Sequence, residues 1–183
     1  QEKFVGDRIV ARQRQINYYI TLAQRYRAES YRLLDIEWSN FDHILTWLIT
    51  QNRWTQAIQI ISDLTYLHLG VAGFFDARGY WQRGEALCNQ ALATLTNSDD
   101  ALRRAELQLK LGIFALRQAA YEQAAQHLQA TFVVLTQVQA NLDAAIYEAY
   151  ACEAMAQILI VTTQDLSAPL NLCEQARQKL QKV

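Results

Sequence analysis

Apolar residues recur along this chain at the spacing of an α-helix. In the clearest segment they follow in steps of four and three, which keeps them on one helix face. These residues are Leu34, Trp38, Phe41, Leu45 and Leu48. The same periodicity predicts helices over residues 7–27, 31–51, 54–78, 80–95, 101–118, 121–138 and 142–161, and a last one from Ser167. Gly70 and Gly73 lie inside the predicted helix 54–78, so we expect a kink or short break there.

A second pattern links these helices in pairs. Four times, a residue is followed at +12, +16 and +19 by residues that are mostly small or apolar. The four sets are Leu45/Ala57/Ile61/Leu64, Ala72/Gly84/Cys88/Ala91, Gly112/Ala124/Leu128/Thr131 and Gln157/Pro169/Cys173/Ala176. Two packed helices joined by a tight turn produce such an offset, because each close crossing needs a small side chain at a set distance from the turn.

The two patterns together predict one all-α domain over residues 1–183. We expect a solenoid of about eight antiparallel helices in four pairs. The pairs are a first pair over 7–51, a second over 54–95, a third and most regular over 101–138, and a degenerate terminal pair over 142–181.

Composition agrees with this class. The chain is 51% hydrophobic, with one Pro and six Gly, too few turn residues for a protein of many strands. No stretch approaches the roughly 18 apolar residues that span a bilayer, and no signal sequence opens the chain. We therefore expect a cytoplasmic protein. Because it begins at Gln1 and not Met, we also expect a piece of a longer one.

Cysteine and histidine residues suggest no special chemistry. Cys88, Cys152 and Cys173 fit neither a disulfide framework nor a metal-ligand spacing, so we expect them to be buried packing residues. The three histidines have no metal-like partners, and no nucleophile motif occurs. Asp and Glu residues are scattered along polar faces. We therefore expect no enzyme, no cofactor and no metal.

Charge is distributed unevenly along the chain. Residues 1–32 carry seven Lys or Arg against three Asp or Glu, a net charge of +4, while the remaining residues carry ten against fifteen, or −5. We interpret the basic end as the solvated face of the first helix, with a docking patch as the alternative. The total of −1 gives no reason to expect nucleic acid or an anionic membrane as partner.

The third pair resembles a tetratricopeptide repeat. Leu111-Gly112 in its first helix is followed, after a turn, by the aromatic-acidic pair Tyr121-Glu122 and the small residue Ala124. This resemblance implies a right-handed α-solenoid that binds a protein or peptide. In that family the inner, concave surface comes from the first helix of each pair. Carried onto this chain, the candidate contact residues are Asp42, Thr46, Tyr66, Leu69, Asp76, Glu106, Leu109 and Arg117.

A second resemblance covers residues 9–95. It rests on short motifs, among them Glu37-x-x-Asn40, Trp54 and the turn Arg78-Gly79-Tyr80-Trp81. The segment is similar to the start of the repeat region of bacterial STAND-class (NB-ARC-like) signalling ATPases. The resemblance implies a sensor or scaffold region of a larger switch protein. The nucleotide-binding loop itself does not occur in this sequence.

We therefore expect a non-catalytic protein–protein interaction module that belongs to a larger signalling ATPase or regulator, with Arg78, Gly79, Tyr80 and Trp81 as turn anchors. Its partners would be a protein or peptide, or other domains of the same longer chain. The alternatives are a free-standing adaptor or homodimeric self-assembly module, and a small-molecule pocket within the superhelix.

Overall fold

The computed structural model describes residues 2–27, 31–68, 71–95, 101–139, 141–163 and 167–181. Over these residues the chain forms nine helices and one short hairpin, which confirms the predicted all-α class and corrects the expected count of eight. The chain divides into two compact units, unit 1 over residues 1–79 and unit 2 over residues 80–183.

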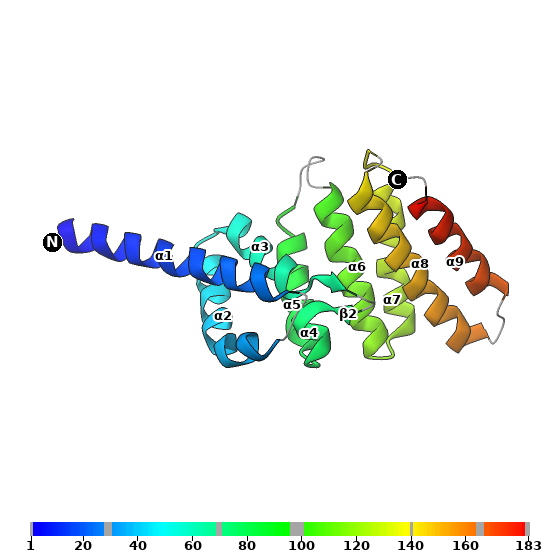
Figure 1. The fold of residues 1–183 in the computed structure, drawn as a ribbon, viewed down its shortest axis with the longest axis horizontal. Helices are drawn as coiled ribbons and strands as arrows, with labels where there is room; N and C mark the ends of the chain where they lie inside the picture. Colours follow the sequence, from blue (N-terminus) through cyan, green and yellow to red (C-terminus); the bar gives the residue numbers. More distant parts are fainter. Residues whose placement is uncertain are drawn as a thin grey trace. The chain divides into compact units, whose positions relative to one another are not determined.

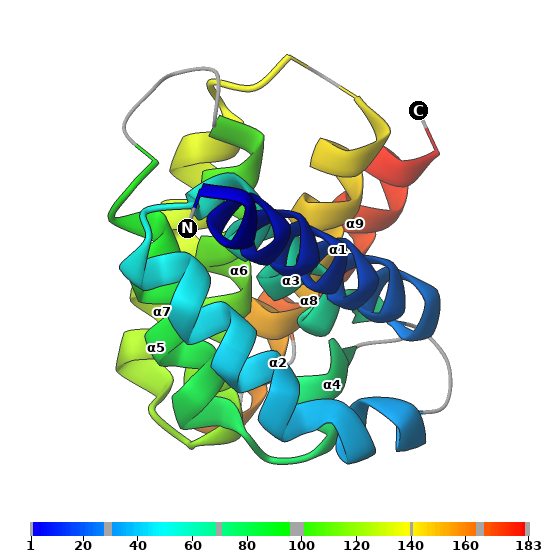
Figure 2. The ribbon, with the colours of Figure 1, turned by 90° about the vertical axis from the view of Figure 1, so that its left-hand side faces the viewer.

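Unit 1 contains four helices and the hairpin. The elements are α1 (Glu2–Tyr26), α2 (Arg32–Thr50), α3 (Trp54–Leu64), β1 (Leu67–His68), β2 (Val71–Ala72) and α4 (Gly73–Ala77). Helix α1 packs on both α2 and α3 (Figure 2), and its N-terminal end projects beyond the rest of the unit (Figure 1). The part of α1 that contacts the unit includes Arg12 and the residues that follow it.

Aromatic contacts join α1 to α2 in the core of unit 1. Tyr19 meets Phe41 edge to face, with ring centroids 4.9 Å apart, and its hydroxyl donates to Oε2 of Glu37 at 2.9 Å. Burial and the contact with the Glu37 carboxylate raise the pKa of Tyr19 to about 12. Ile16 and Ala23 are fully buried on the same stripe of α1.

The predicted helix 54–78 is interrupted. Helix α3 ends at Leu64, strands β1 and β2 pair antiparallel with Leu67 opposite Ala72, and α4 begins at Gly73. Gly73 has φ +65°, and a Cβ there would lie 2.5 Å from the carbonyl oxygen of Leu64. The break therefore falls where the glycines predicted a kink or a short break. Asp76 stabilises the return, since its Oδ2 accepts the N–H of Ala72 at 3.1 Å.

Unit 2 is a succession of helices packed on their neighbours (Figure 1). They are α5 (Trp81–Leu92), α6 (Ala101–Arg117), α7 (Tyr121–Leu135), α8 (Leu142–Thr163) and α9 (Ser167–Leu180). Contacts between α6 and α7 and between α8 and α9 are the most extensive, and α6 also touches α8.

Three turns between helices share one backbone geometry. Each has a residue in the left-handed region, with φ 54° at Asn52, 70° at Gly79 and 58° at Ala119. An aromatic residue follows two positions later as the first residue of the next helix; these are Trp54, Trp81 and Tyr121. The first and third turns also share a closing hydrogen bond of Schellman type, from Arg53 N to the Leu48 carbonyl and from Ala120 N to the Ala115 carbonyl.

The small-residue ladder is buried around each of these turns. All members of the first three sets are buried, whereas in the fourth set Gln157 is only half-buried and Cys173 is exposed. The closest approach is at Gly112, where an added Cβ would lie 2.8 Å from Cδ2 of Leu128. The absence of a side chain at Gly112 therefore allows α6 and α7 to approach closely.

Two minor expectations need correction. The prediction that the cysteines are buried is confirmed for Cys88 and Cys152 and is wrong for Cys173, which lies exposed on α9. Burial also raises the pKa of the Cys88 thiol to about 12.

Among the described residues, α8 is long and apolar enough to cross a membrane, so the expectation that no segment reaches this length does not hold for it. This helix packs on α6, α7 and α9, and 39% of its apolar window is buried. The predicted cytoplasmic location stays a prediction.

Ala119 provides a test of the turn geometry. Because a non-glycine residue at φ 58° is strained, Ala119→Gly should raise the free energy of unfolding by about 1 kcal/mol. Ala125→Gly, the same change in the interior of α7, should lower it by about 1 kcal/mol. Urea denaturation followed by circular dichroism measures both. Destabilisation by Ala119→Gly would contradict the turn assignment.

Candidate functional site

Two arginines of unit 1 converge on one indole ring. The guanidinium carbon of Arg12 lies 5.1 Å from the ring centroid of Trp47, and that of Arg53 lies 5.8 Å from it. Both distances are within the range of a cation–π interaction. We call Arg12, Gln13, Gln15, Trp47 and Arg53 the Trp47 cluster.

Glutamine side chains orient both guanidinium groups. Arg12 donates from Nη1 to Oε1 of Gln15 at 2.8 Å, and Arg53 donates from Nη2 to Oε1 of Gln13 at 2.6 Å. A neutral amide oxygen accepts a hydrogen bond without cancelling charge. Within the described part of the chain, neither guanidinium contacts a carboxylate. Among the described side chains, the two positive charges of the cluster therefore have no acidic partner.

Local structure explains why these side chains meet. Arg12 lies one turn before Ile16 on the stripe of α1 that packs into unit 1, so the helix directs it toward α2. Arg53 comes directly after the left-handed residue Asn52, in the turn that follows α2. Trp47 lies in the last turns of α2 and is half-buried.

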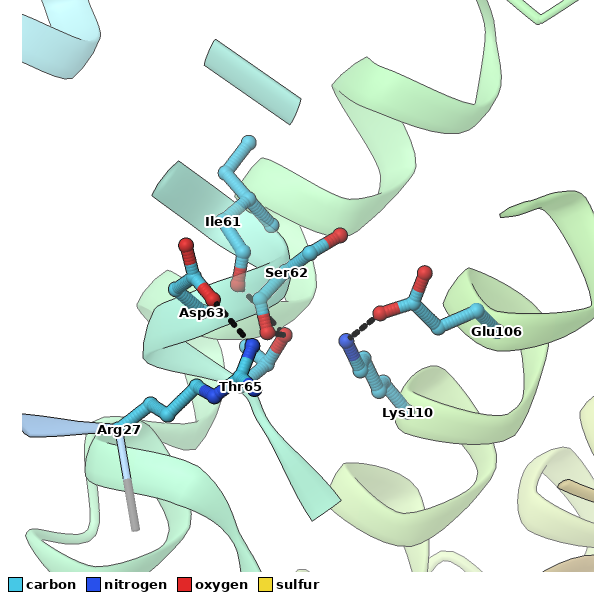
Figure 3. Close-up of polar contacts among 7 residues, drawn as sticks. All are labelled: Arg27, Ile61, Ser62, Asp63, Thr65, Glu106 and Lys110. Carbon is cyan, nitrogen blue, oxygen red and sulfur yellow. Dashed lines mark hydrogen bonds and ion pairs between the residues drawn. The ribbon is translucent and has the colours of Figure 1, made fainter. Parts of the chain in front are cut away.

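Two of the other arginines that stack on aromatic rings, Arg27 and Arg78, have acidic partners, whereas Arg25, which lies 5.6 Å from the ring centroid of Tyr26, shows none among the described residues. Arg27 lies 4.3 Å from the ring centroid of Tyr66, and its Nη1 lies 3.1 Å from Oδ1 of Asp63 (Figure 3). Arg78 pairs with Asp35, with Nη2 and Oδ2 2.7 Å apart. Hydrogen bonds from Arg78 lower the pKa of the Asp35 carboxyl group. The charge of the Trp47 cluster is thus not a general feature of the arginines in this unit.

The sequence-predicted contact residues of unit 1 lie in different environments. Thr46 is exposed and Asp42 half-buried, one turn apart on α2. Tyr66 is half-buried under the guanidinium group of an arginine. Asp76 is buried and accepts a backbone N–H, whereas Leu69 lies outside the described residues. Thr46 is next to Trp47 in the chain, so it borders the Trp47 cluster.

The predicted contact residues of unit 2 all lie on α6. Glu106 forms an ion pair with Lys110, one turn away on the same helix (Figure 3). Leu109 is fully buried, so its side chain is not on the surface. Arg117 is exposed in the last turn of α6.

The four predicted turn anchors have separate roles. Arg78 is held by Asp35, and Gly79 supplies the left-handed turn. Tyr80 is 38% exposed and Trp81 is half-buried at the start of α5. Tyr80 is therefore the more accessible of the two aromatic anchors.

Sequence reasoning missed the Trp47 cluster. It did not single out Trp47 as a candidate contact residue, and it interpreted the basic residues of the first helix as a solvated face. One signal was present, because Arg12 continues the stripe of Ile16, Tyr19 and Ala23, where an apolar residue is expected.

A second polar network lies in unit 2. The carboxylate of Glu85 on α5 accepts hydrogen bonds from Gln118 at 3.3 Å and Gln123 at 3.2 Å. Nδ1 of His127 lies 2.8 Å from Oε1 of Gln108. Burial lowers the pKa of His127, and the nearby Glu85 charge opposes this shift. These contacts tie α5, α6 and α7 together.

Neither site has the composition of a metal centre. Over the residues that the structure describes, no group of three or more His, Cys, Asp or Glu side chains is placed to hold a metal ion. Comparisons of the chain with protein-family models, with curated proteins and with solved structures give no match.

His127 should make folding stability depend on pH. Its folded-state pKa is below the value of about 6.5 in an unfolded chain, so the unfolded state binds more protons and stability decreases as pH falls below about 6.5. Thermal unfolding between about pH 7.5 and about pH 5.5 should show a smaller loss for His127→Gln than for the wild type. Gln129→Ala, which changes an exposed residue of the same helix that does not titrate, serves as the control and should retain the wild-type slope. Identical slopes for His127→Gln and the wild type would contradict the assignment.

Proposed function

We propose that this chain is a non-catalytic protein–protein interaction module, built as a right-handed solenoid of tetratricopeptide-like helix pairs. The observation that carries the proposal is the repeated turn. Asn52, Gly79 and Ala119 share the left-handed conformation, each precedes an aromatic helix start, and each is flanked by buried ladder residues. Repetition of one helix-turn-helix unit is typical of proteins that act through an extended surface.

The Trp47 cluster supports an interaction role more directly. Aromatic and arginine side chains dominate binding energy at protein interfaces, and here an indole and two guanidinium groups lie together. Thr46 and Asp42, predicted as contact residues, lie on the same helix as Trp47. The proposed contact surface therefore centres on α1, α2 and the turn after α2.

The wider context of the module is also a proposal. The motifs Glu37-x-x-Asn40 and Arg78-Gly79-Tyr80-Trp81, which resemble the repeat region of STAND-class signalling ATPases, both lie in the segment that contains the Trp47 cluster. In such a protein, this surface would bind a partner or another domain of the same chain. Binding there would then bias the state of the larger switch.

Site-specific photo-crosslinking tests the contact surface. A benzophenone amino acid at Thr46 should capture a partner in the native cell extract, because Thr46 is exposed beside the Trp47 cluster. The same residue at Glu122, exposed on α7, is the matched control and should give less product. Excess untagged wild-type chain should abolish the Thr46 product. A product that competitor does not reduce, or equal products at both positions, would argue against this surface.

Self-assembly is a second candidate, favoured by exposed apolar side chains at both ends of the described chain. Ile9 on α1 is 65% exposed, and Leu170 on α9 is 68% exposed. Val161, near the end of α8, is 57% exposed. Large apolar side chains in such positions are typical of surfaces that another molecule covers.

Light scattering over a concentration range distinguishes the two candidates. If the chain assembles through these ends, its mean mass should rise with concentration, and Leu170→Ser should reduce the rise because it removes exposed apolar area. Asn171→Ser, a change at a neighbouring exposed polar position, should leave the assembly unchanged. A constant monomer mass would rule out self-assembly.

A further inference from the structure

We propose that the Trp47 cluster binds a pair of carboxylate groups on an acidic peptide segment of a partner protein. This inference rests on the proposed function, and it names the chemistry that the contact surface recognises. Its basis is the combination of two guanidinium groups, one indole and no acidic neighbour, which the described residues show at one place.

Most N–H donors of the two guanidinium groups have no hydrogen-bond partner among the described residues. A guanidinium group has five N–H donors, and the structure shows one side-chain hydrogen bond for Arg12 and one for Arg53. Both accepting atoms are neutral amide oxygens. A carboxylate can accept two parallel hydrogen bonds from a guanidinium group and also neutralise its charge. Two carboxylates would therefore satisfy both groups.

The two guanidinium groups are also preorganised. Gln13 of α1 holds Arg53, although the two residues are 40 positions apart in the sequence. Trp47 lies beneath both groups and limits their motion. An arginine that is already ordered loses less side-chain entropy on binding, which favours affinity.

The surroundings favour a peptide over a polyanion. Ile9 is 65% exposed one helical turn before Arg12 and Gln13, so an apolar surface adjoins the cationic one. Acidic segments that also carry apolar side chains fit such a surface. The residues after position 32 carry a net charge of −5, which would repel the extended phosphate backbone of a nucleic acid.

Fluorescence anisotropy with a defined probe tests the proposal. The probe is a short fluorescein-labelled peptide with the centre Glu-Leu-Glu-Leu-Asp, and the control peptide has Gln-Leu-Gln-Leu-Asn in its place. The full chain should bind the acidic peptide with a dissociation constant of roughly micromolar order, and added salt should weaken binding. The control peptide should not bind measurably.

Matched variants locate the site. Arg12→Gln and Arg53→Gln should each weaken binding about tenfold or more, because each removes a charge-assisted pair. Arg14→Gln removes the same charge from an exposed position of α1 outside the cluster and should leave binding within about twofold of the wild type. Arg12→Lys keeps the charge but loses the planar fork, so it should weaken binding by an intermediate amount. Circular dichroism identifies any variant that fails to fold. In that case a second measurement uses the wild-type chain: an unlabelled glutamate-rich peptide should displace the labelled acidic peptide from it.

Each contrary result has a definite meaning. The proposal would be overturned if the acidic peptide did not bind, or if Arg14→Gln and Arg12→Gln lost equal affinity for it. Tighter binding to oligo(dT) or to phosphatidylserine vesicles than to the peptide would overturn it as well. A competed crosslink at Thr46 without peptide binding would leave the interaction function standing and reject only the acidic chemistry. Peptide binding that depends on Arg12 and Arg53 supports both the interaction function and the acidic chemistry of the partner.

Discussion

The close approach of paired helices at small residues is the constraint on which the rest of this structure depends. At Gly112 a Cβ atom would lie 2.8 Å from Cδ2 and 2.9 Å from Cγ of Leu128, and 3.4 Å from the carbonyl oxygen of Ala124. Helices α6 and α7 reach this separation because the turn at Ala119 reverses the chain within a few residues. The same geometry at Asn52 places α3 against α2, and Arg53 follows directly from that turn.

The position of Arg53 connects this packing constraint to the proposed function. A looser or longer turn after α2 would separate Arg53 from Trp47 and from Gln13 on α1. Arg27 and Arg78 of unit 1 instead stabilise the fold through carboxylate partners, Asp63 and Asp35. The Trp47 cluster lacks such a partner among the described residues, and this difference is why it is a better candidate for binding than for stability alone.

Much of the local structure was predictable from the sequence, and the exceptions have physical reasons. Stripes of apolar residues located the helices, and Gly79 identified a turn because glycine tolerates a positive φ. The hairpin between α3 and α4 was not predicted, because an apolar run that contains Leu67 and Val71 is compatible with either helix or strand. In the sequence, only the glycines signalled the break. The steric reason for glycine at position 73 is that a Cβ there would collide with the carbonyl oxygen of Leu64, and no sequence pattern shows this contact.

The sequence by itself determined where helices and turns form, since these depend on residues within one or two turns of each other. The tertiary structure alone decided which partners the arginines of unit 1 meet on other helices. Arg27 and Asp63 are 36 residues apart, Arg78 and Asp35 are 43 apart, and Arg53 and Gln13 are 40 apart. Whether an arginine meets a carboxylate or an amide at such separations depends on how the helices pack, because local periodicity gives no information about a partner on another helix. The lack of an acidic partner for the Trp47 cluster among the described side chains was therefore visible only in the folded chain.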